Sequence, residues 1–444
     1  MNWAEEEFSS IDLGDARLNK RTALLAERLA RSPATSIPQA CSGSHETQAA
    51  YRFFDHESVD FWSIMEPHFQ CTLKRMSAQP VVLCLQDTTS LDFNGKQVEG
   101  LGPLQYEAQR GMLLHPSYAV TPSREPLGLL DSWHWAREAR QEDGERPESI
   151  NESDRWVEGY ERIGELASEL PETRCVYVGD RESDIVALMR RANELGHPAD
   201  WLVRARHNRA LPEGKKLFDE VGAGKPLGVI SFVLPARKNT KARKVEQTIH
   251  AKRISIKDGK RGTIQITCVI ARENNPPAGK KAVQWKLLTN RSVTKLDQAS
   301  ELIDWYRARW EIEMFFDVLK NGCQVETLQL KTVERLEVAL AIYLIVAWRI
   351  NRLMRLGREC PNMDATLVFD DDEILAAYAI NKRRRVRGSK PGLNEVIRLI
   401  AMAGGFLARK SDGEPGSKTL WRGIDKVLIF VEGLRYARDN PEYE

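Results

Sequence analysis

Residues 80–87 read Pro-Val-Val-Leu-Cys-Leu-Gln-Asp, a continuous apolar run that ends on a carboxylate. A run of this kind predicts a strand that is buried on both faces, as in a sheet that helices cover. A second short apolar run, 174–178, ends at Gly179-Asp180. Around these two runs the pattern predicts further strands over 111–120, 127–135 and 200–205 and helices over 155–168 and 182–193.

The order of these elements predicts an α/β domain with the ribonuclease-H-like topology. They follow one another as β-β-β-α-β-α-β, and in a mixed sheet ordered 3-2-1-4-5 the first and fourth strands lie side by side. Asp87 and Asp180 would then meet at one edge of the sheet although 93 residues separate them. Residues 210–290 predict a β-rich insertion in this domain, with strands over 229–234, 246–256, 263–271 and 285–289.

The sequence predicts helical regions at both ends of the chain. In residues 1–70, leucines recur at helical spacing while basic residues occupy other positions, which suits a small DNA-binding domain. We expect residues 71–365 to form the ribonuclease-H-like catalytic domain and residues 366–444 to form a helical region that mediates dimerisation. An amphipathic helix can also pack within its own chain, so intramolecular packing of the last helices is the alternative.

The composition excludes several classes of protein. Of the 444 residues, 42% are hydrophobic and 29% are charged, which is ordinary for a globular protein and excludes a wholly disordered chain. The longest apolar run, 338–348, has 11 residues, whereas about 20 are needed to span a bilayer. The acidic N-terminus lacks the basic and apolar regions of a signal peptide, so we expect a cytoplasmic protein.

The cysteines and histidines limit the metal chemistry. The seven cysteines include no CxxC pair, and the eight histidines include no HExxH motif. A disulfide framework, a zinc site and a histidine-based metal centre are therefore not indicated. Any metal would have to be held by carboxylates, which favour Mg²⁺ or Mn²⁺.

The net charge of +2 conceals strong local segregation of charge. Residues 235–264 hold ten Lys and Arg against two acids, and residues 382–390 hold six Lys and Arg with no acid. Residues 141–154, by contrast, hold six acids and one Arg. Clustered positive charge within a neutral total is what a polyanion-binding surface requires, although each cluster taken singly could equally be a solvated loop.

A third carboxylate lies in a predicted helix that includes residues 305–320. At about 100° per residue, four polar side chains fall within one arc of roughly 60°: Tyr306, Arg309, Glu313 and Lys320. The opposite side is apolar and is expected to face the core: Ala308, Ile312, Phe315 and Leu319. Taken alone, this is more often an ordinary amphipathic helix with an Arg309–Glu313 pair. Together with Asp87 and Asp180, however, Glu313 completes a carboxylate set that suits a pair of Mg²⁺ ions acting on a phosphodiester.

These motifs resemble those of DDE transposases of the bacterial insertion-sequence-four family. The resemblance rests on three ordered motifs: Gln86-Asp87-Thr88-Thr89-Ser90-Leu91, Asp180-Arg181-Glu182-Ser183-Asp184-Ile185 and Tyr306-x2-Arg309-x3-Glu313-x6-Lys320. Further similarity lies in Trp3-Ala4, Leu13-Gly14-Asp15, Ala50-Tyr51-Arg52-Phe53 and Trp285-x-Leu287-Leu288-Thr289. The sequence departs from the pattern at Val186, where a histidine is expected, and at Arg206, where a lysine is expected.

The resemblance implies roles for individual residues. Asp87, Asp180 and Glu313 match the metal-binding catalytic triad. Residues that match positions in contact with DNA are Tyr306, Arg309, Lys320, Arg204 and Arg206. Trp285 matches a position on which a flipped-out base stacks, with strand core as the alternative, and Trp310 matches a second aromatic that supports this distortion. Glu182 and Asp184 are alternative candidates for the second catalytic carboxylate. We expect them instead to begin the following helix, where the helix dipole favours acids.

The implied function is cut-and-paste DNA transposition. The chain would bind the terminal inverted repeats of its element, pair two ends as a homodimer, nick the DNA in a metal-dependent step, form and open a hairpin, and join the 3′ ends to target DNA. Two alternatives are a stand-alone ribonuclease-H-like nuclease and an inactive end-binding protein, such as a transposition inhibitor. The N-terminal region argues against the first alternative, and the three intact carboxylates argue against the second.

Overall fold

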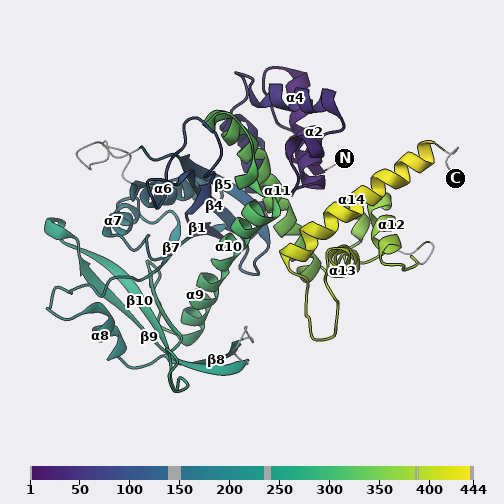
Figure 1. Cartoon of the computed structure of the whole chain (residues 1–444). Coiled ribbons are helices and arrows are strands. Elements are labelled where there is room, and N and C mark those ends of the chain that lie inside the picture. The colour runs from purple at the N-terminus through teal and green to yellow at the C-terminus, as the bar shows by residue number, and fades with distance from the viewer. Residues whose placement is uncertain (1–2, 139–151, 235–241, 386–387, 389, 441–444) are drawn as a thin grey trace.

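The computed structural model describes residues 3–138, 152–234, 242–385, 388 and 390–440. Eleven strands in these residues form one sheet, with helices on both of its faces (Figure 1). The strand order is β2-β4-β1-β6-β7-β11-β10-β9-β8, and β3 and β5 also pair with β4. The strands span Val81–Gln86 (β1), Thr89–Asp92 (β2), Gly102–Pro103 (β3), Arg110–Val120 (β4), Pro126–Trp135 (β5), Arg174–Gly179 (β6), Asp200–Arg204 (β7), Gly228–Leu234 (β8), Arg243–Lys257 (β9), Thr263–Glu273 (β10) and Gln284–Thr289 (β11).

The α-helices lie in three groups along the chain. The N-terminal group spans Trp3–Glu7 (α1), Ala16–Arg31 (α2), Ile37–Ala40 (α3), Ser44–Phe54 (α4) and Phe61–Ser77 (α5). The middle group spans Asp154–Glu169 (α6), Val186–Glu194 (α7) and Leu217–Gly222 (α8). The last group spans Leu296–Ala308 (α9), Trp310–Asp317 (α10), Val333–Glu359 (α11), Asp371–Ile380 (α12), Leu393–Ala403 (α13) and Ser417–Asp439 (α14).

The pairing of β1 with β6 forms the centre of the sheet. These two strands are parallel, with Leu85 opposite Val178, whereas β1 and β4 are antiparallel, with Gln86 opposite Ser117. Strands β5, β4, β1, β6 and β7 therefore lie in that order. The predicted 3-2-1-4-5 order is confirmed, and the two strands that lead into Asp87 and Asp180 end at the same edge of the sheet.

The side chains of β1 alternate between two hydrophobic cores. Leu83 and Leu85 are fully buried in a core that includes apolar side chains of α5, α9, α10 and α11. Val82 and Cys84 are fully buried in a second core, on the other face, with apolar side chains of α6 and α7. Both faces of the strand are covered, which is why its sequence is continuously apolar and does not alternate with polar residues.

The predicted β-rich insertion continues the central sheet. Strands β11 and β7 are antiparallel, with Leu287 opposite Arg204. Strands β10, β9 and β8 then follow, each antiparallel to the one before. Each of the four predicted strands lies inside an observed strand. In Figure 1 these strands extend away from the C-terminal helices. The insertion is thus joined to the core by backbone hydrogen bonds as well as by its chain ends.

A buried polar cluster ties the N-terminal helices to the sheet. Both terminal nitrogens of Arg75 in α5 donate to the Glu7 carboxylate of α1 at 2.9 Å. His68 Nε2 accepts the Leu129 N–H of β5 at 3.0 Å, so the ring proton lies on Nδ1, which donates to Glu7 at 2.6 Å. Burial by itself would raise the pKa of Glu7, but His68 and Arg75 together lower it to about 2.

Helix α11 connects the sheet to the C-terminal helices. The apolar run 338–348 lies within it and is buried throughout. Beyond it, α12, α13 and α14 form a separate core with the last turns of α11, including Leu353 and Met354. Among the helices of the described residues, none has the length and apolar character needed to cross a membrane.

Parts of the predicted charge clusters lie outside the described residues. These are most of the acidic stretch 141–154, residues 235–241 of the first basic cluster, and residues 386, 387 and 389 of the second. The rest of the first basic cluster lies on β9, on the start of β10 and on the turn between them.

We predict that Glu7→Gln lowers the stability of the protein at neutral pH and makes it less sensitive to acid. The carboxylate has a folded-state pKa of about 2 against an ordinary value of 4.5. Its contribution is therefore present above about pH 4.5 and is lost as the pH falls towards 2. Removal of this buried charge should cost on the order of 3 kcal/mol near pH 7.

Thermal melts of both proteins between neutral pH and about pH 3 measure this difference. Glu6→Gln changes an exposed position of the same helix and should behave as the wild type. Parallel stability curves for the wild type and Glu7→Gln would contradict the inferred pairing.

Candidate active site

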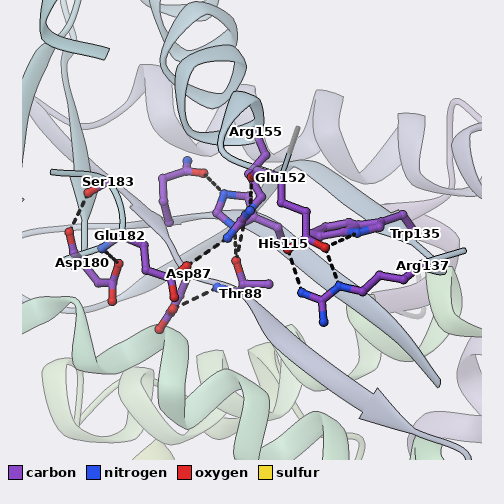
Figure 2. Close-up of polar contacts among 11 residues, drawn as sticks. Asp87, Thr88, His115, Trp135, Arg137, Glu152, Arg155, Asp180, Glu182 and Ser183 are labelled. Carbon is purple, nitrogen blue, oxygen red and sulfur yellow. Dashed lines mark hydrogen bonds and ion pairs between the residues drawn. The ribbon is translucent and has the colours of Figure 1, made fainter. Parts of the chain in front are cut away.

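Asp87 and Asp180 follow the two parallel central strands and are held in a similar way. Asp87 comes directly after β1, and its Oδ1 accepts the backbone N–H of Thr88 at 2.9 Å. Asp180 comes directly after β6, and its Oδ1 accepts the backbone N–H of Glu182 at 2.7 Å. The Ser183 hydroxyl donates to the Asp180 carbonyl at 2.7 Å (Figure 2). Each carboxylate is therefore oriented by the loop that it begins.

The loop after β6 corrects one prediction. Residues 182–185 do not begin a helix, because α7 starts only at Val186. The buried Asp184 carboxylate forms an ion pair with Arg209 and accepts the backbone N–H groups of Arg206 at 2.6 Å and His207 at 2.9 Å. These contacts between distant segments hold residues 180–185 as a loop. Of the rivals to Asp180, Asp184 thus pairs with Arg209, and Glu182 pairs with Arg155 at 3.0 Å.

Arg309 links the third carboxylate to the first. Its Nη1 donates to Asp87 Oδ2 at 2.5 Å, and its Nη2 donates to Glu313 Oε1 at 3.2 Å. Arg309 lies at the junction of two helices, since α9 ends at Ala308 and α10 begins at Trp310. The guanidinium therefore spans from the sheet to the helix that carries Glu313.

The segment 305–320 is not the single regular helix that we expected. Besides the junction at Arg309, residues Val318–Gly322 form a π-helical turn that contains Lys320. The four residues predicted to face the core are fully buried: Ala308, Ile312, Phe315 and Leu319. Tyr306, however, is only 3% exposed, whereas the Glu313 side chain is 40% exposed. Burial raises the pKa of Tyr306 and the nearby Arg309 charge opposes this, so Tyr306 lies close to Arg309 but is enclosed. It belongs to α9, which packs on the insertion, and its ring lies edge-on against Trp285 at 5.5 Å.

Burial and nearby charges shift the pKa of Asp87. Burial, and then the charges of Asp180 and Glu313, raise the pKa of Asp87 to about 6, although Arg309 opposes this shift. Burial by itself would lower the pKa of Arg309, but the Asp87 charge raises it above its usual range. In the described part of the chain, no three His, Cys, Asp or Glu side chains stand close enough to form a ready-made metal site. The oxygen donors nevertheless suit a hard divalent cation, since Arg309 alone pairs with two of the three carboxylates.

Basic and aromatic side chains lie beside the carboxylates. Arg204, at the end of β7, stacks its guanidinium over the Trp285 ring at 5.2 Å. Trp285 on β11 is partly buried, so it is neither free in solvent nor wholly part of the core. Arg206 is exposed, and Trp310 is 61% exposed. Lys320 Nζ lies 3.8 Å from Glu326 Oε1.

The sequence motifs missed a buried polar network next to these residues. It includes Arg155 at the start of α6 and His115 on β4, whose contacts with Thr88 are drawn in Figure 2. Arg155 directly follows the acidic stretch, and no spacing relates it to Asp87 or Asp180. The one sequence signal is an arginine in the first turn of a helix, where the dipole disfavours a positive charge.

Three family models match the chain one after another. A model for transposase DNA-binding matches residues 1–59, a transposase DDE domain matches residues 146–349, and a Tn5 transposase dimerisation domain matches residues 345–443. A solved structure of a piggyBac transposase synaptic complex with hairpin DNA matches 98% of this chain and 80% of its own at 9% identity, with a TM-score of 0.38. That structural likeness is too low to support an argument about this chain.

The three family matches agree with the observed architecture. The DNA-binding model covers α1 to α4, the DDE model covers β6 to β11 with both Asp180 and Glu313, and the dimerisation model covers α12 to α14. DNA is therefore a binding partner, the chain dimerises, and its activity depends on divalent metal ions. The chain is a DDE transposase of the cut-and-paste type, similar to the Tn5 transposase and consistent with the insertion-sequence-four family.

Proposed function

We propose that Asp87, Asp180 and Glu313 bind the divalent metal ions with which this transposase cleaves and joins DNA. The observation that carries this proposal is geometric: Arg309 pairs with both Asp87 and Glu313, and Asp87 and Asp180 follow the neighbouring ends of the parallel strands β1 and β6. Carboxylate oxygens favour Mg²⁺, and Mn²⁺ is expected to substitute for it. The bound ions would activate an oxygen nucleophile and stabilise the leaving oxygen.

Arg309 is proposed to hold the carboxylate cluster together and then to contact DNA. Its two ion pairs offset the repulsion between Asp87 and Glu313. A guanidinium can donate to a phosphate in the same forked way as to a carboxylate, so it can exchange one anion for the other. Lys320, whose side chain is 23% exposed, would add a second phosphate contact on the same segment.

The aromatic residues are proposed to support a distorted DNA end. Trp285 lies between Arg204, which stacks over it, and Tyr306, which packs against it edge-on. These neighbours fix the indole ring of Trp285 but leave it partly accessible. An unstacked base could therefore stack on it. Arg206 and the exposed Trp310 would contact the DNA on either side. Buried Tyr306 would then act chiefly by supporting Trp285.

The proposed reaction begins at the terminal inverted repeats of the element. Nicking frees a 3′-hydroxyl, which attacks the opposite strand to give a hairpin and release the element. The hairpin is opened, and the 3′-hydroxyl is joined to target DNA. Two copies of the chain would hold the two ends in one synaptic complex, through α12 to α14, in the cytoplasm where the bacterial nucleoid lies. We propose residues 1–70 for end binding, 71–365 for catalysis and 366–444 for dimerisation.

Glu313→Gln is expected to abolish strand cleavage and to leave end binding intact. The amide keeps the size of the side chain but removes the charge that a divalent cation needs. A linear duplex with the terminal repeats that flank the coding sequence, incubated with Mg²⁺ or Mn²⁺ and resolved on a denaturing gel, measures nicks and hairpins. Asp317→Asn, one turn further along, where Asp317 accepts from Asn321 Nδ2, is the matched control and should cleave normally.

The same gel tests the function as a whole. Nicks without hairpins or joined products would point to a nuclease, and end binding without any cleavage by the wild type would point to an inactive end-binding protein. Cleavage by Glu313→Gln at the wild-type rate would remove Glu313 from the ligand set.

Trp285→Ala is expected to slow hairpin formation while first-strand nicking continues. Loss of the stacking face should cost about 1–3 kcal/mol, which corresponds to a roughly 5- to 150-fold slower hairpin step. Time courses of nicked and hairpin products separate the two steps. Lys286→Ala is the control, because Lys286 is the next residue of β11 but places its Nζ over the Phe218 ring. An equal loss of nicking and hairpins in Trp285→Ala would indicate a general structural role.

A further inference from the structure

Arg155 joins three segments of the chain beside the candidate active site. Its Nε donates to Thr88 Oγ1 at 3.1 Å in the segment after β1, and its Nη2 donates to Glu182 Oε2 at 3.0 Å in the loop after β6. Its Nη1 donates to the Glu152 carbonyl just before α6. Figure 2 shows the guanidinium reaching both loops from α6.

The surroundings of Arg155 exclude most solvent. The residue is 6% exposed, and its guanidinium lies 5.6 Å from the Trp135 ring and 5.0 Å from the Trp156 ring. Two aromatic rings at these distances stabilise the cation and leave little room for water. The guanidinium itself is therefore shielded from solvent, and its bond to Thr88 lies in this enclosed part, whereas the Glu182 carboxylate is 59% exposed.

A directional chain of hydrogen bonds fixes the Thr88 side chain as well. Burial lowers the pKa of His115 to about 3, so its ring is neutral. His115 Nε2 lies 3.1 Å from Gln86 Oε1, which can only accept, so the ring proton is on Nε2 and Nδ1 is an acceptor. The Thr88 hydroxyl therefore donates to His115 Nδ1 at 2.9 Å and accepts from Arg155. The Gln86 amide donates in turn to Ser117 at 2.7 Å.

Arg155 binds the side chains of Thr88 and Glu182, and these two residues orient Asp87 and Asp180. The backbone N–H of Thr88 donates to Asp87 Oδ1, and the backbone N–H of Glu182 donates to Asp180 Oδ1. One planar guanidinium is thus connected to both carboxylates through one residue on each side. The connection crosses between the two loops where the backbone pairing of β1 with β6 has ended at Leu85 and Val178.

We propose that Arg155 is a positioning residue that sets the spacing and orientation of Asp87 and Asp180 for metal binding. Its planar guanidinium donates hydrogen bonds to the side chains of both Thr88 and Glu182 and so fixes them relative to each other. Glu182 is then a partner of Arg155 and not a metal ligand. Partners of this kind, which orient the ligands of a metal, commonly affect affinity or activity 10- to 100-fold when they are removed. The proposal rests on the proposed function, since it requires that Asp87 and Asp180 bind the metal.

Three substitutions separate this role from its rivals. Arg155→Lys keeps the charge, but a single ammonium cannot reproduce the planar fork. Thr88→Val removes the hydroxyl and introduces no change in charge, and Glu182→Ala removes an exposed carboxylate whose loss should not impair folding. Arg191→Gln is the control, because Arg191 of α7 pairs with Glu161 of α6 and this ion pair involves neither the segment after β1 nor the loop after β6.

The test is a titration of the full-length protein, bound to its end DNA, with Mn²⁺ alone, in which free Mn²⁺ is read by its electron paramagnetic resonance signal. We expect Arg155→Lys, Thr88→Val and Glu182→Ala each to bind Mn²⁺ about 10- to 100-fold more weakly than wild type. The double variant Thr88→Val/Glu182→Ala should lose less than the product of the two single losses, because both act through one guanidinium. Arg191→Gln should bind as wild type does.

Other outcomes would overturn the proposal in distinguishable ways. Wild-type Mn²⁺ affinity in Thr88→Val with weak binding in Glu182→Ala would make Glu182 a ligand and remove the role of Arg155. Wild-type affinity in all three variants, with Asp87→Asn unable to bind Mn²⁺, would refute the positioning role and leave the proposed ligands intact. Equal Mn²⁺ binding by wild type and Asp87→Asn would refute the proposed function itself.

Discussion

The parallel pairing of β1 with β6 is the constraint on which the candidate site depends. Parallel strands end at the same edge of a sheet, so this pairing places Asp87 and Asp180 together without any contact between the two side chains. The two cores on either face, one with α6 and α7 and the other with α5 and α9 to α11, bury both strands and fix their register. The chemistry of the site is thus positioned by the burial of apolar side chains.

Carboxylates brought together in this way repel one another, and two arginines act on them in different ways. Arg309 acts directly, because its guanidinium pairs with both Asp87 and Glu313. Arg155 acts indirectly, because it binds the side chains of Thr88 and Glu182, whose backbone N–H groups orient Asp87 and Asp180. Arg309 can exchange a carboxylate partner for a DNA phosphate. Arg155, by contrast, lies beside Trp135 and Trp156, and its role is structural.

The β-rich insertion shares the backbone hydrogen bonds of the catalytic sheet. Because β11 pairs with β7, Trp285 keeps a fixed position relative to Arg204 and to Tyr306 of α9. A separately folded insertion on flexible linkers could not hold an aromatic ring in a fixed position relative to the catalytic sheet. The C-terminal helices, by contrast, have their own hydrophobic core, which suits a region that packs against a second copy of the chain.

The sequence by itself determined nine of the eleven strands, the order of the central five and the apolar face of the helix with Glu313, because continuous apolar runs and helical spacing are local properties of the chain. The short strands β2 and β3 carry no such run and were not predicted. The motif resemblance added the family and the proposed role of the three carboxylates. Tertiary structure decided the break at Arg309, the burial of Tyr306 and the loop at 180–185. It also decided the position of Arg155, because each of these four features depends on partners more than 20 residues away along the chain, such as Trp285 for Tyr306 and Arg206 for Asp184. Local periodicity carries no information about such distant partners, and only the packed fold brings them together.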